Sequence, residues 1–175
     1  MDDFKKIILP LLITIAFIIF VGLLTKNDGN LSKIKPKGPE NKPQQNLIDI
    51  TINNNVYLKA TLADTDKLRQ KGLGKIQKLE ESQGMLFTFP EENSSPSFWM
   101  KDMLIPIDII WINDGKIVQI DKNVQPPDSG TPDNKLKLYK ADFPVDYVLE
   151  VNGGFSEKNK IDTGASITIN LPTGQ

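Results

Sequence analysis

An uncharged apolar run near the start of the chain most restricts how this polypeptide can fold. Residues 7–24 contain no charged side chain, and fourteen of the eighteen are Ile, Leu, Phe or Val. As an α-helix, such a run extends roughly 27 Å, close to the hydrocarbon thickness of a bilayer. Pro10 falls in the first turn, where it removes no helical hydrogen bond. The run predicts one transmembrane anchor over residues 7–24 after a short tail, residues 1–6, with the lipid bilayer as a partner.

A cleaved signal peptide is the main alternative to this anchor. No small-x-small cleavage site follows Leu24 before the charged stretch, and the run exceeds an ordinary signal-peptide core. Lys5 and Lys6 favour a cytoplasmic N-terminus, whereas five lysines between residues 26 and 46 favour the opposite orientation. Because a short tail ending in two lysines is typical of a signal anchor, we expect a single-pass protein of the cell membrane with its domain outside the cytoplasm.

Residues 25–46 have the composition of a linker. They are rich in Lys, Pro, Asn, Gly and Gln and contain almost no large apolar side chain. Such a segment cannot bury enough apolar surface to offset the entropy that ordering it would remove. We expect a disordered linker that spans on the order of 25 Å between the anchor and a domain formed by residues 47–175.

The composition of residues 47–175 excludes several classes of protein. Fourteen basic and eighteen acidic groups give a net charge of −4, so the basic surface that nucleic-acid binders need is missing and nucleic acid is not an expected partner. The chain contains neither cysteine nor histidine. Disulfides, Cys–His and Ser–His nucleophilic pairs and the usual zinc sites are therefore excluded. We predict no cofactor and no metal ligand, and we assign no catalytic residue.

Alternating apolar and polar residues predict a β-rich domain. Ile48, Ile50 and Ile52 alternate with polar residues, and Asp114-Gly115 is typical of a hairpin turn. The expected strands are 48–53, 56–62, 84–89, 97–101, 107–113, 116–121, 145–151 and 165–171, with short helices at 66–72 and 156–159 and an irregular loop over 123–143. This pattern predicts a β-rich α+β fold, a compact single-domain barrel or sandwich of about seven or eight short strands with one or two short helices.

The densest group of unusual residues lies between Ser97 and Asp108. On an extended strand over residues 97–101, Ser97, Trp99 and Lys101 share one face. On the following strand, Asp108 shares a face with Ile110 and Ile112. A carboxylate inside an apolar strand is costly unless it is paired. Three roles of Asp108 therefore stay open. It has a structural role, in which it caps a turn or pairs with Lys101, or it joins Trp99 and Lys101 in a ligand pocket. In the third, Asp108 or Lys101 is a buried catalytic base with a shifted pKa.

Two other features bear on a pocket. Trp99 and Trp111 are candidate platforms for sugar rings, although aromatic residues on strands more often belong to a core. The loop over residues 123–143, with Asn123 and Pro126, is a candidate lid.

These residues lead to two hypotheses of function. The first is a binding or envelope-structural module at the membrane surface, with a small-molecule or glycan ligand. Its candidate binding residues are Trp99, Lys101, Asp108, Asn123 and Pro126. The second is a metal-independent hydrolase or transferase that uses Lys101, Asp108 or Ser97. The absence of histidine and cysteine favours the binding module.

Five short motifs resemble those of a known family. They are Gln70–Leu73 (QKGL), Gly84–Phe87 (GMLF), Phe89-Pro90, Phe98–Lys101 (FWMK) and Ile105–Asp108 (IPID), in the expected order and spacing. On these motifs, residues 47–171 resemble the domain of unknown function 192 family, an uncharacterised prokaryotic family. The resemblance implies a small β-rich fold, often exported behind a signal or anchor, and no established activity.

The chain departs from that family's pattern at two places. A methionine usually follows Gly-Leu, with an arginine two residues later, where this chain has Gly74 and Ile76. Asp102-Met103 replaces the usual Asn-Thr after the FWMK motif. Any role of that arginine or asparagine is therefore not carried over to this chain.

The anchor predicts that the chain, expressed in cells, sediments with membranes and stays there after a high-salt wash. Insertion of the apolar run is favoured by several kcal/mol, whereas one aspartate at the helix centre costs about 3 kcal/mol. Immunoblots of washed membranes should therefore retain the wild-type chain and lose a variant with Ile13→Asp and Ile18→Asp. A wild-type chain that washes off, or that is shortened just after Leu24, would contradict the anchor.

Overall fold

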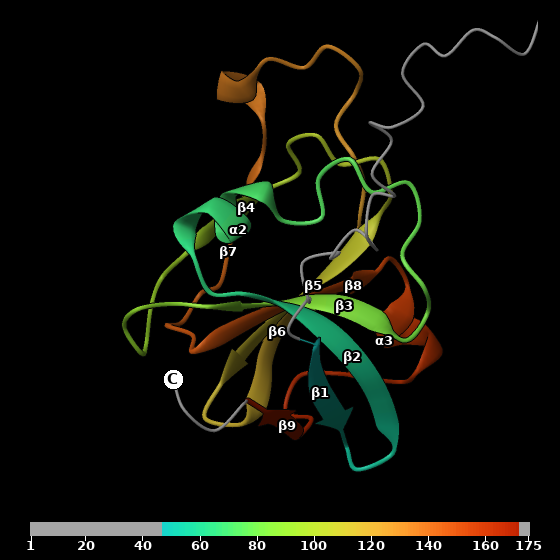
Figure 1. The fold of residues 1–175 in the computed structure, drawn as a ribbon, viewed down its shortest axis with the longest axis vertical. Helices are drawn as coiled ribbons and strands as arrows, with labels where there is room; N and C mark the ends of the chain where they lie inside the picture. Colours follow the sequence, from blue (N-terminus) through green and yellow to red (C-terminus); the bar gives the residue numbers. More distant parts are fainter. Residues whose placement is uncertain (1–46, 172–175) are drawn as a thin grey trace, which may run out of the picture. The chain divides into compact units, whose positions relative to one another are not determined.

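The computed structural model describes residues 47–171 and builds them around a seven-stranded sheet and a two-stranded ribbon (Figure 1). The strands are β1 (Leu47–Ile52), β2 (Val56–Ala63), β3 (Gln83–Thr88), β4 (Ser97–Trp99), β5 (Ile107–Asn113), β6 (Lys116–Val124), β7 (Leu138–Lys140), β8 (Tyr147–Asn152) and β9 (Ile167–Asn170). Three short helical segments accompany them in the described residues: α2 (Asp66–Lys71), the 3-10 turn η2 (Asp133–Lys135) and α3 (Phe155–Lys158).

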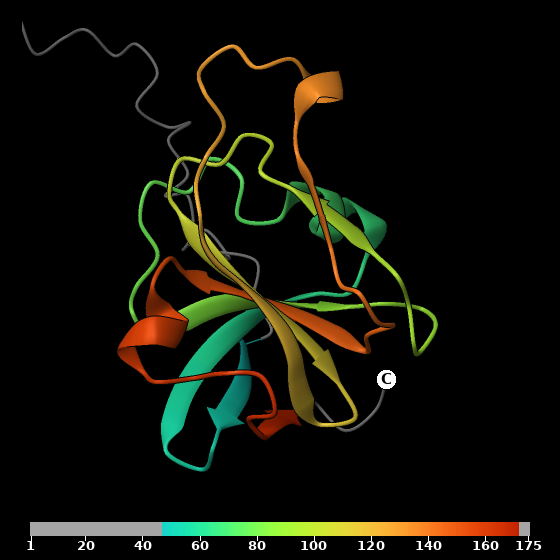
Figure 2. The ribbon, with the colours of Figure 1, turned by 180° about the vertical axis from the view of Figure 1, so that it is seen from behind.

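The large sheet curls into a half-barrel (Figures 1 and 2). Its strand order is β6-β5-β8-β3-β2-β1-β9, and β2 and β3 form the parallel pair. The two edge strands approach each other at one end, where the N–H of Ile117 donates to the Ala165 carbonyl at 3.0 Å and the N–H of Ile167 donates to the Gly115 carbonyl at 2.9 Å. The predicted β-rich architecture with a few short helices is thus confirmed in the form of a curled half-barrel.

The predicted anchor and linker, residues 7–24 and 25–46, lie outside the described residues. Within residues 47–171, none of the helices has the length and apolar character that crossing a bilayer requires.

Both faces of the large sheet are covered, which gives the domain two core clusters. On β5, Ile110 and Ile112 belong to the cluster that reaches α3 and β9. Ile109 and Trp111 point the other way, into the cluster that reaches α2 and the β4–β7 ribbon. The alternation predicted for this strand is therefore confirmed, and a strand buried on both faces reads as a nearly continuous apolar run.

Apart from shifts of one to three residues at other strand ends, two segments differ from the prediction. The strand expected over residues 97–101 ends at Trp99, because the chain turns at Lys101 and Asp102, where Asp102 adopts a left-handed φ of 58°. The segment 123–143, expected to be an irregular loop, contains the end of β6, then η2 and β7. β7 has three residues and pairs with β4 through Trp99 and Leu138. A strand this short depends on a distant partner, and the local pattern carries too little signal to reveal it.

A buried carboxylate on β5 joins three parts of the fold. Asp108 is fully buried, and its Oδ1 accepts hydrogen bonds from the N–H groups of Asn123 at 2.7 Å and Gly154 at 2.8 Å. Its Oδ2 accepts from the N–H of Ser156 at 2.7 Å. Gly154 is the N-cap of α3 and lacks a capping side chain, so Asp108 provides from another strand the acceptor that a helix start needs. The carboxylate links β5 with β6 and with the turn into α3.

We expect Asp108→Asn to lower the free energy of unfolding by about 2–4 kcal/mol, because an amide leaves at least one buried N–H group without an acceptor. Urea unfolding of the detergent-solubilised chain, followed by circular dichroism, measures this change. Asp49→Asn is the matched control, since Asp49 is an exposed carboxylate paired with Lys59 and should cost less than about 1 kcal/mol. Equal effects of the two substitutions would contradict the structural role of Asp108.

Candidate functional site

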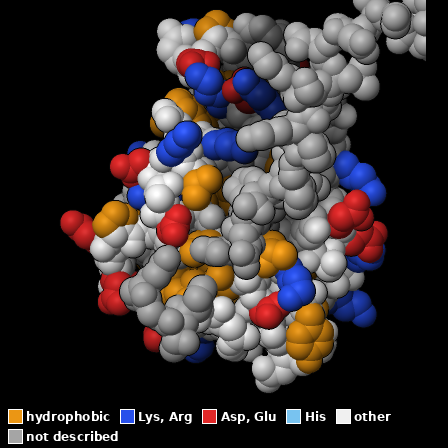
Figure 3. Space-filling view, viewed as in Figure 1, with side chains coloured by type: hydrophobic (Ala, Val, Ile, Leu, Met, Phe, Trp, Pro, Cys, Tyr) orange, Lys and Arg blue, Asp and Glu red, His pale blue; other side chains and the backbone are white. Residues whose placement is uncertain are grey.

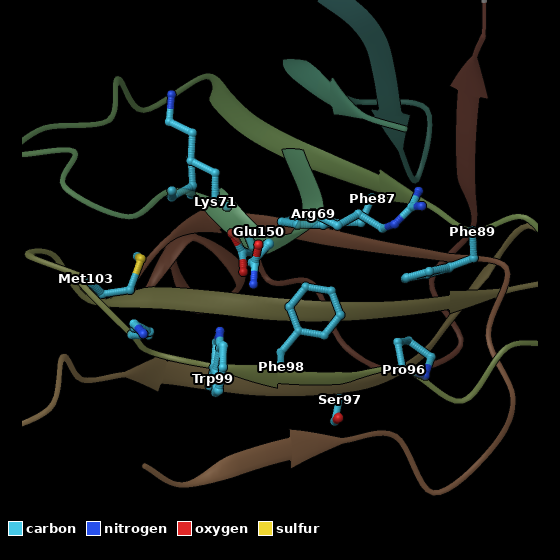
Figure 4. A pocket seen from close by; sticks show the side chains of 14 residues that line it. Arg69, Lys71, Phe87, Phe89, Pro96, Ser97, Phe98, Trp99, Met103 and Glu150 are labelled. Atoms are coloured by element: carbon cyan, nitrogen blue, oxygen red, sulfur yellow. The ribbon is translucent and has the colours of Figure 1, made fainter. Parts of the chain in front are cut away.

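Lysine and arginine side chains gather on the surface around α2 (Figure 3), and a cavity of about 310 Å³ lies beside this helix. We name it the Glu150 cavity (Figure 4). Its lining comes from the end of α2 and the turn after it, from β3 and β8 of the large sheet, and from β4 with the segments on either side of it. The lining residues are Arg69, Gln70, Lys71, Gly72, Leu73, Phe87, Phe89, Pro96, Ser97, Phe98, Trp99, Lys101, Met103 and Glu150.

Aromatic side chains form one wall of this cavity. The rings of Phe87 and Phe98 meet edge to face with centroids 4.8 Å apart, and Phe98 meets Trp111 of the core in the same way at 5.5 Å. Trp99 is 39% exposed, and the Nζ of Lys101 lies 5.6 Å from the centroid of its ring. Phe98 is thus held by the core, whereas Trp99 offers an accessible ring to a ligand.

Glu150 lies at the floor of the cavity. It occupies the middle of β8, opposite Met85 of β3 and Ile109 of β5, and is only 5% exposed. Burial raises the pKa of Glu150 to about 8, and a backbone hydrogen bond from Leu73 opposes part of this rise. The side chain is therefore mainly a neutral carboxylic acid near neutral pH.

The carboxyl of Glu150 has unused hydrogen-bonding capacity. Its Oε2 is buried and has no hydrogen-bond partner among the residues that the structure describes. The close-up places this side chain among those that point into the cavity (Figure 4). Because buried polar atoms are almost always paired, an unpaired one at the floor of a cavity indicates a place for a ligand atom.

Asp108 and Glu150 are the two buried acids of the described residues, and their surroundings differ. Three backbone N–H groups saturate Asp108, whereas one backbone hydrogen bond reaches Glu150. The Oγ of Ser156 is also buried without a partner, but Ser156 lies against Asp108 and does not line the Glu150 cavity. Of the two acids, Glu150 is the one available for binding.

The structure brings some of the sequence-predicted residues together and separates others. Trp99, Lys101 and Ser97 all line the Glu150 cavity. Lys101 forms an ion pair with Asp133 of η2, not with Asp108. Asp108 itself lies outside the lining of this cavity.

The two predicted residues beyond β5 also lie away from the cavity. Asn123 adopts a left-handed φ of 50° and donates its N–H to Asp108, while its side-chain oxygen accepts from Gln125 at 3.0 Å. Pro126 is half-buried in the segment after β6 and does not line the Glu150 cavity.

Glu150 was not among the predicted site residues, although the sequence carries a signal for it. It is the single charged residue in the run Tyr147–Asn152 (YVLEVN), the same kind of isolated acid that singled out Asp108. The sequence pattern marks Asp108 and Glu150 as buried acids but does not reveal which of them has hydrogen-bond donors around it. Within residues 47–171, no three acidic side chains come together as ligands for a metal ion.

Comparisons with known proteins agree with this fold. The sequence profile of the domain of unknown function 192 family, described as "Uncharacterized ACR", matches residues 48–169. No curated protein matches the chain. Among the solved structures that are similar to this chain, two have a TM-score of 0.62 each.

The first of these structures is a protein of unknown function from Novosphingobium aromaticivorans, 26% identical, with 70% of this chain and 84% of that chain covered. The second is a proposed transcription regulator from Sinorhizobium meliloti, 25% identical, with 71% of this chain and 95% of that chain covered. The profile match extends over more than half of the chain and over all nine strands except the outermost residues of β1 and β9. This chain belongs to the domain of unknown function 192 family.

Proposed function

We propose that this chain is a membrane-anchored binding module whose domain, outside the cytoplasm, holds a small molecule or a sugar ring in the Glu150 cavity. The unpartnered Oε2 of Glu150 at the floor of an aromatic-lined cavity carries the proposal. A buried polar atom without a partner costs about 1–3 kcal/mol, and a ligand that supplies a hydrogen bond recovers this loss.

The lining supports a ring-shaped ligand. The cavity volume of about 310 Å³ lies at the lower end of the range for small-molecule sites, about 300–1,000 Å³. Phe98 and Trp99 offer flat apolar surfaces for an aromatic ring or for the apolar face of a sugar. A neutral Glu150 donates one hydrogen bond, so the inner end of the ligand should present a hydroxyl or carbonyl oxygen.

Attachment to the membrane is part of the same proposal. The apolar run over residues 7–24 and the polar segment over residues 25–46 support a domain tethered near a bilayer. A tethered domain encounters ligands at the membrane surface at a high effective concentration.

The alternative, a metal-independent hydrolase or transferase that uses Lys101, Asp108 or Ser97, has less support. The carboxylate of Asp108 is saturated by backbone N–H groups and lies outside the cavity lining. Lys101 is held in an ion pair with Asp133. A role in transcription, proposed for the similar protein from Sinorhizobium meliloti, has little support here, because the domain carries a net charge of −4.

A binding module predicts that a ligand raises the melting temperature of the chain in lipid nanodiscs. We expect at least one member of a panel of simple sugars, aromatic glycosides and peptidoglycan fragments to raise it by roughly 5 °C or more at saturation. Trp99→Ala should abolish this rise, because Trp99 is the accessible ring of the cavity wall. Tyr57→Ala is the control, since Tyr57 is an exposed aromatic residue on β2 outside the cavity. A panel without effect, or a rise that persists in Trp99→Ala, would refute the proposal.

The raised pKa of Glu150 predicts that the stability of the folded chain depends on pH. The folded chain keeps the Glu150 proton up to a pH of about 8, whereas an ordinary glutamate in the unfolded chain releases it near 4.5. Between these values the folded state binds the extra proton, so the free energy of unfolding falls as pH rises. At ~1.4 kcal/mol per pKa unit, the fall amounts to about 5 kcal/mol at most.

Urea unfolding of the solubilised chain at pH 5 and pH 9 tests this dependence. Glu150→Gln should remove the part of this decrease in the free energy of unfolding that ionisation of Glu150 causes. The variant therefore gains stability relative to wild type as pH rises. Glu157→Gln, which replaces an exposed acid of α3, should keep the wild-type profile. Identical pH profiles for wild type and Glu150→Gln would show that Glu150 is already ionised in the folded chain.

A further inference from the structure

A second cavity lies beside the Glu150 cavity. It has a volume of about 400 Å³ and shares Gln70, Lys71, Trp99 and Lys101 with the first. The remaining lining residues are Lys67, Gly74, Lys75 and Asp102. Four lysines and one aspartate thus surround this lysine cavity, although the domain as a whole is acidic. A locally positive cavity in an acidic domain favours an anionic group.

Two of the four lysines are not neutralised by any side chain in the described part of the chain. Lys75 pairs with Asp102 at 3.8 Å, and Lys101 pairs with Asp133. Lys67 and Lys71 have no ion-pair partner within residues 47–171. They lie four residues apart on α2, where like charges face each other and repel. An anion between them would relieve this repulsion.

Trp99 is one of the four residues that line both cavities, and its exposed ring is available to a ligand from either of them. A ring placed against Trp99 with one end toward Glu150 would have its other end free to enter the lysine cavity, which Lys67 and Lys71 line. The inner end meets an uncharged acid with an unpartnered oxygen, and the outer end meets ammonium groups. An ionised carboxylate at the floor would repel an anionic ligand, whereas a neutral acid does not.

We infer that the ligand is an anionic ring compound whose carboxylate, sulfate or phosphate group lies in the lysine cavity between Lys67 and Lys71, while a hydroxyl or carbonyl at its far end binds Glu150. This inference rests on the proposed binding function and gives its ligand a chemical class. Neutral sugars and neutral aromatic compounds would then bind in the same place but more weakly.

Two probes of the same shape test the class of ligand. 6-Hydroxynaphthalene-2-sulfonate carries a ring, a hydroxyl at one end and an anion at the other, and its sulfonamide is the uncharged counterpart. Calorimetric titration of the full chain in phosphatidylcholine nanodiscs, with empty nanodiscs subtracted, gives both affinities. We expect the sulfonate to bind about tenfold more tightly at low salt, with a smaller advantage at high salt because ions screen exposed charges.

A pair of double variants tests the location of the anion. Lys67→Gln with Lys71→Gln should lower the affinity for the sulfonate to that for the sulfonamide and leave the sulfonamide unchanged, which also shows that the variant is folded. Lys116→Gln with Lys160→Gln removes the same charge from exposed positions outside both cavities and should change neither affinity.

The outcomes separate this inference from the proposed function. Equal affinities for the two probes in the wild-type chain would overturn the anionic class and leave the binding module standing. A preference for the sulfonate that survives in Lys67→Gln with Lys71→Gln, or that disappears equally in the control pair, would overturn the role of the lysine cavity. If neither probe binds and the sugar and glycoside panel also has no effect, the binding module itself falls.

Discussion

The three backbone N–H groups that converge on the Asp108 carboxylate hold the centre of the domain together. They come from the end of β6 and from the turn into α3, so one side chain fixes both neighbours of β5. In the pairing of β5 with β8, Asp108 faces Val151 and the next residue, Ile109, faces Glu150. The position of Glu150 in the cavity therefore depends on the register that Asp108 stabilises. A slip of one residue would turn Glu150 to the opposite face of the sheet.

The two buried acids lie in different surroundings on one sheet, which fits a structural role for Asp108 and the binding role proposed for Glu150. Asp108 faces the cluster around α3, where backbone N–H groups satisfy it fully. Glu150 faces the cluster under α2, where apolar and aromatic side chains surround it and burial raises its pKa to about 8. The neutral Glu150 in the Glu150 cavity and the lysines of the lysine cavity form a gradient of polarity from one cavity to the other. Such a gradient would orient the proposed elongated ligand, because each of its two ends has a favourable partner in one direction only.

The family match helps to divide the chain. It extends over residues 48–169, which include the half-barrel, the ribbon and both cavities. The apolar run and the polar segment precede this match, so the anchor and linker proposed here are separate from the family domain. The fold positions the site, and the proposed tether would determine where in the cell the site operates.

The sequence by itself determined the β-rich class, the alternation along β5, the short helix at α2 and membership of the family, because each depends on neighbouring residues or on motifs along the chain. It also marked Trp99 and Lys101 as residues of interest. Only the tertiary structure decided that β7 pairs with β4 and that the Asp108 carboxylate accepts three backbone hydrogen bonds. It also decided that the Oε2 of Glu150 is left without a hydrogen-bond partner within the described residues. The physical reason is that the partners of these groups come from residues distant along the chain. Hydrogen-bond satisfaction and burial are properties of the assembled fold, and no local pattern of residue types records them.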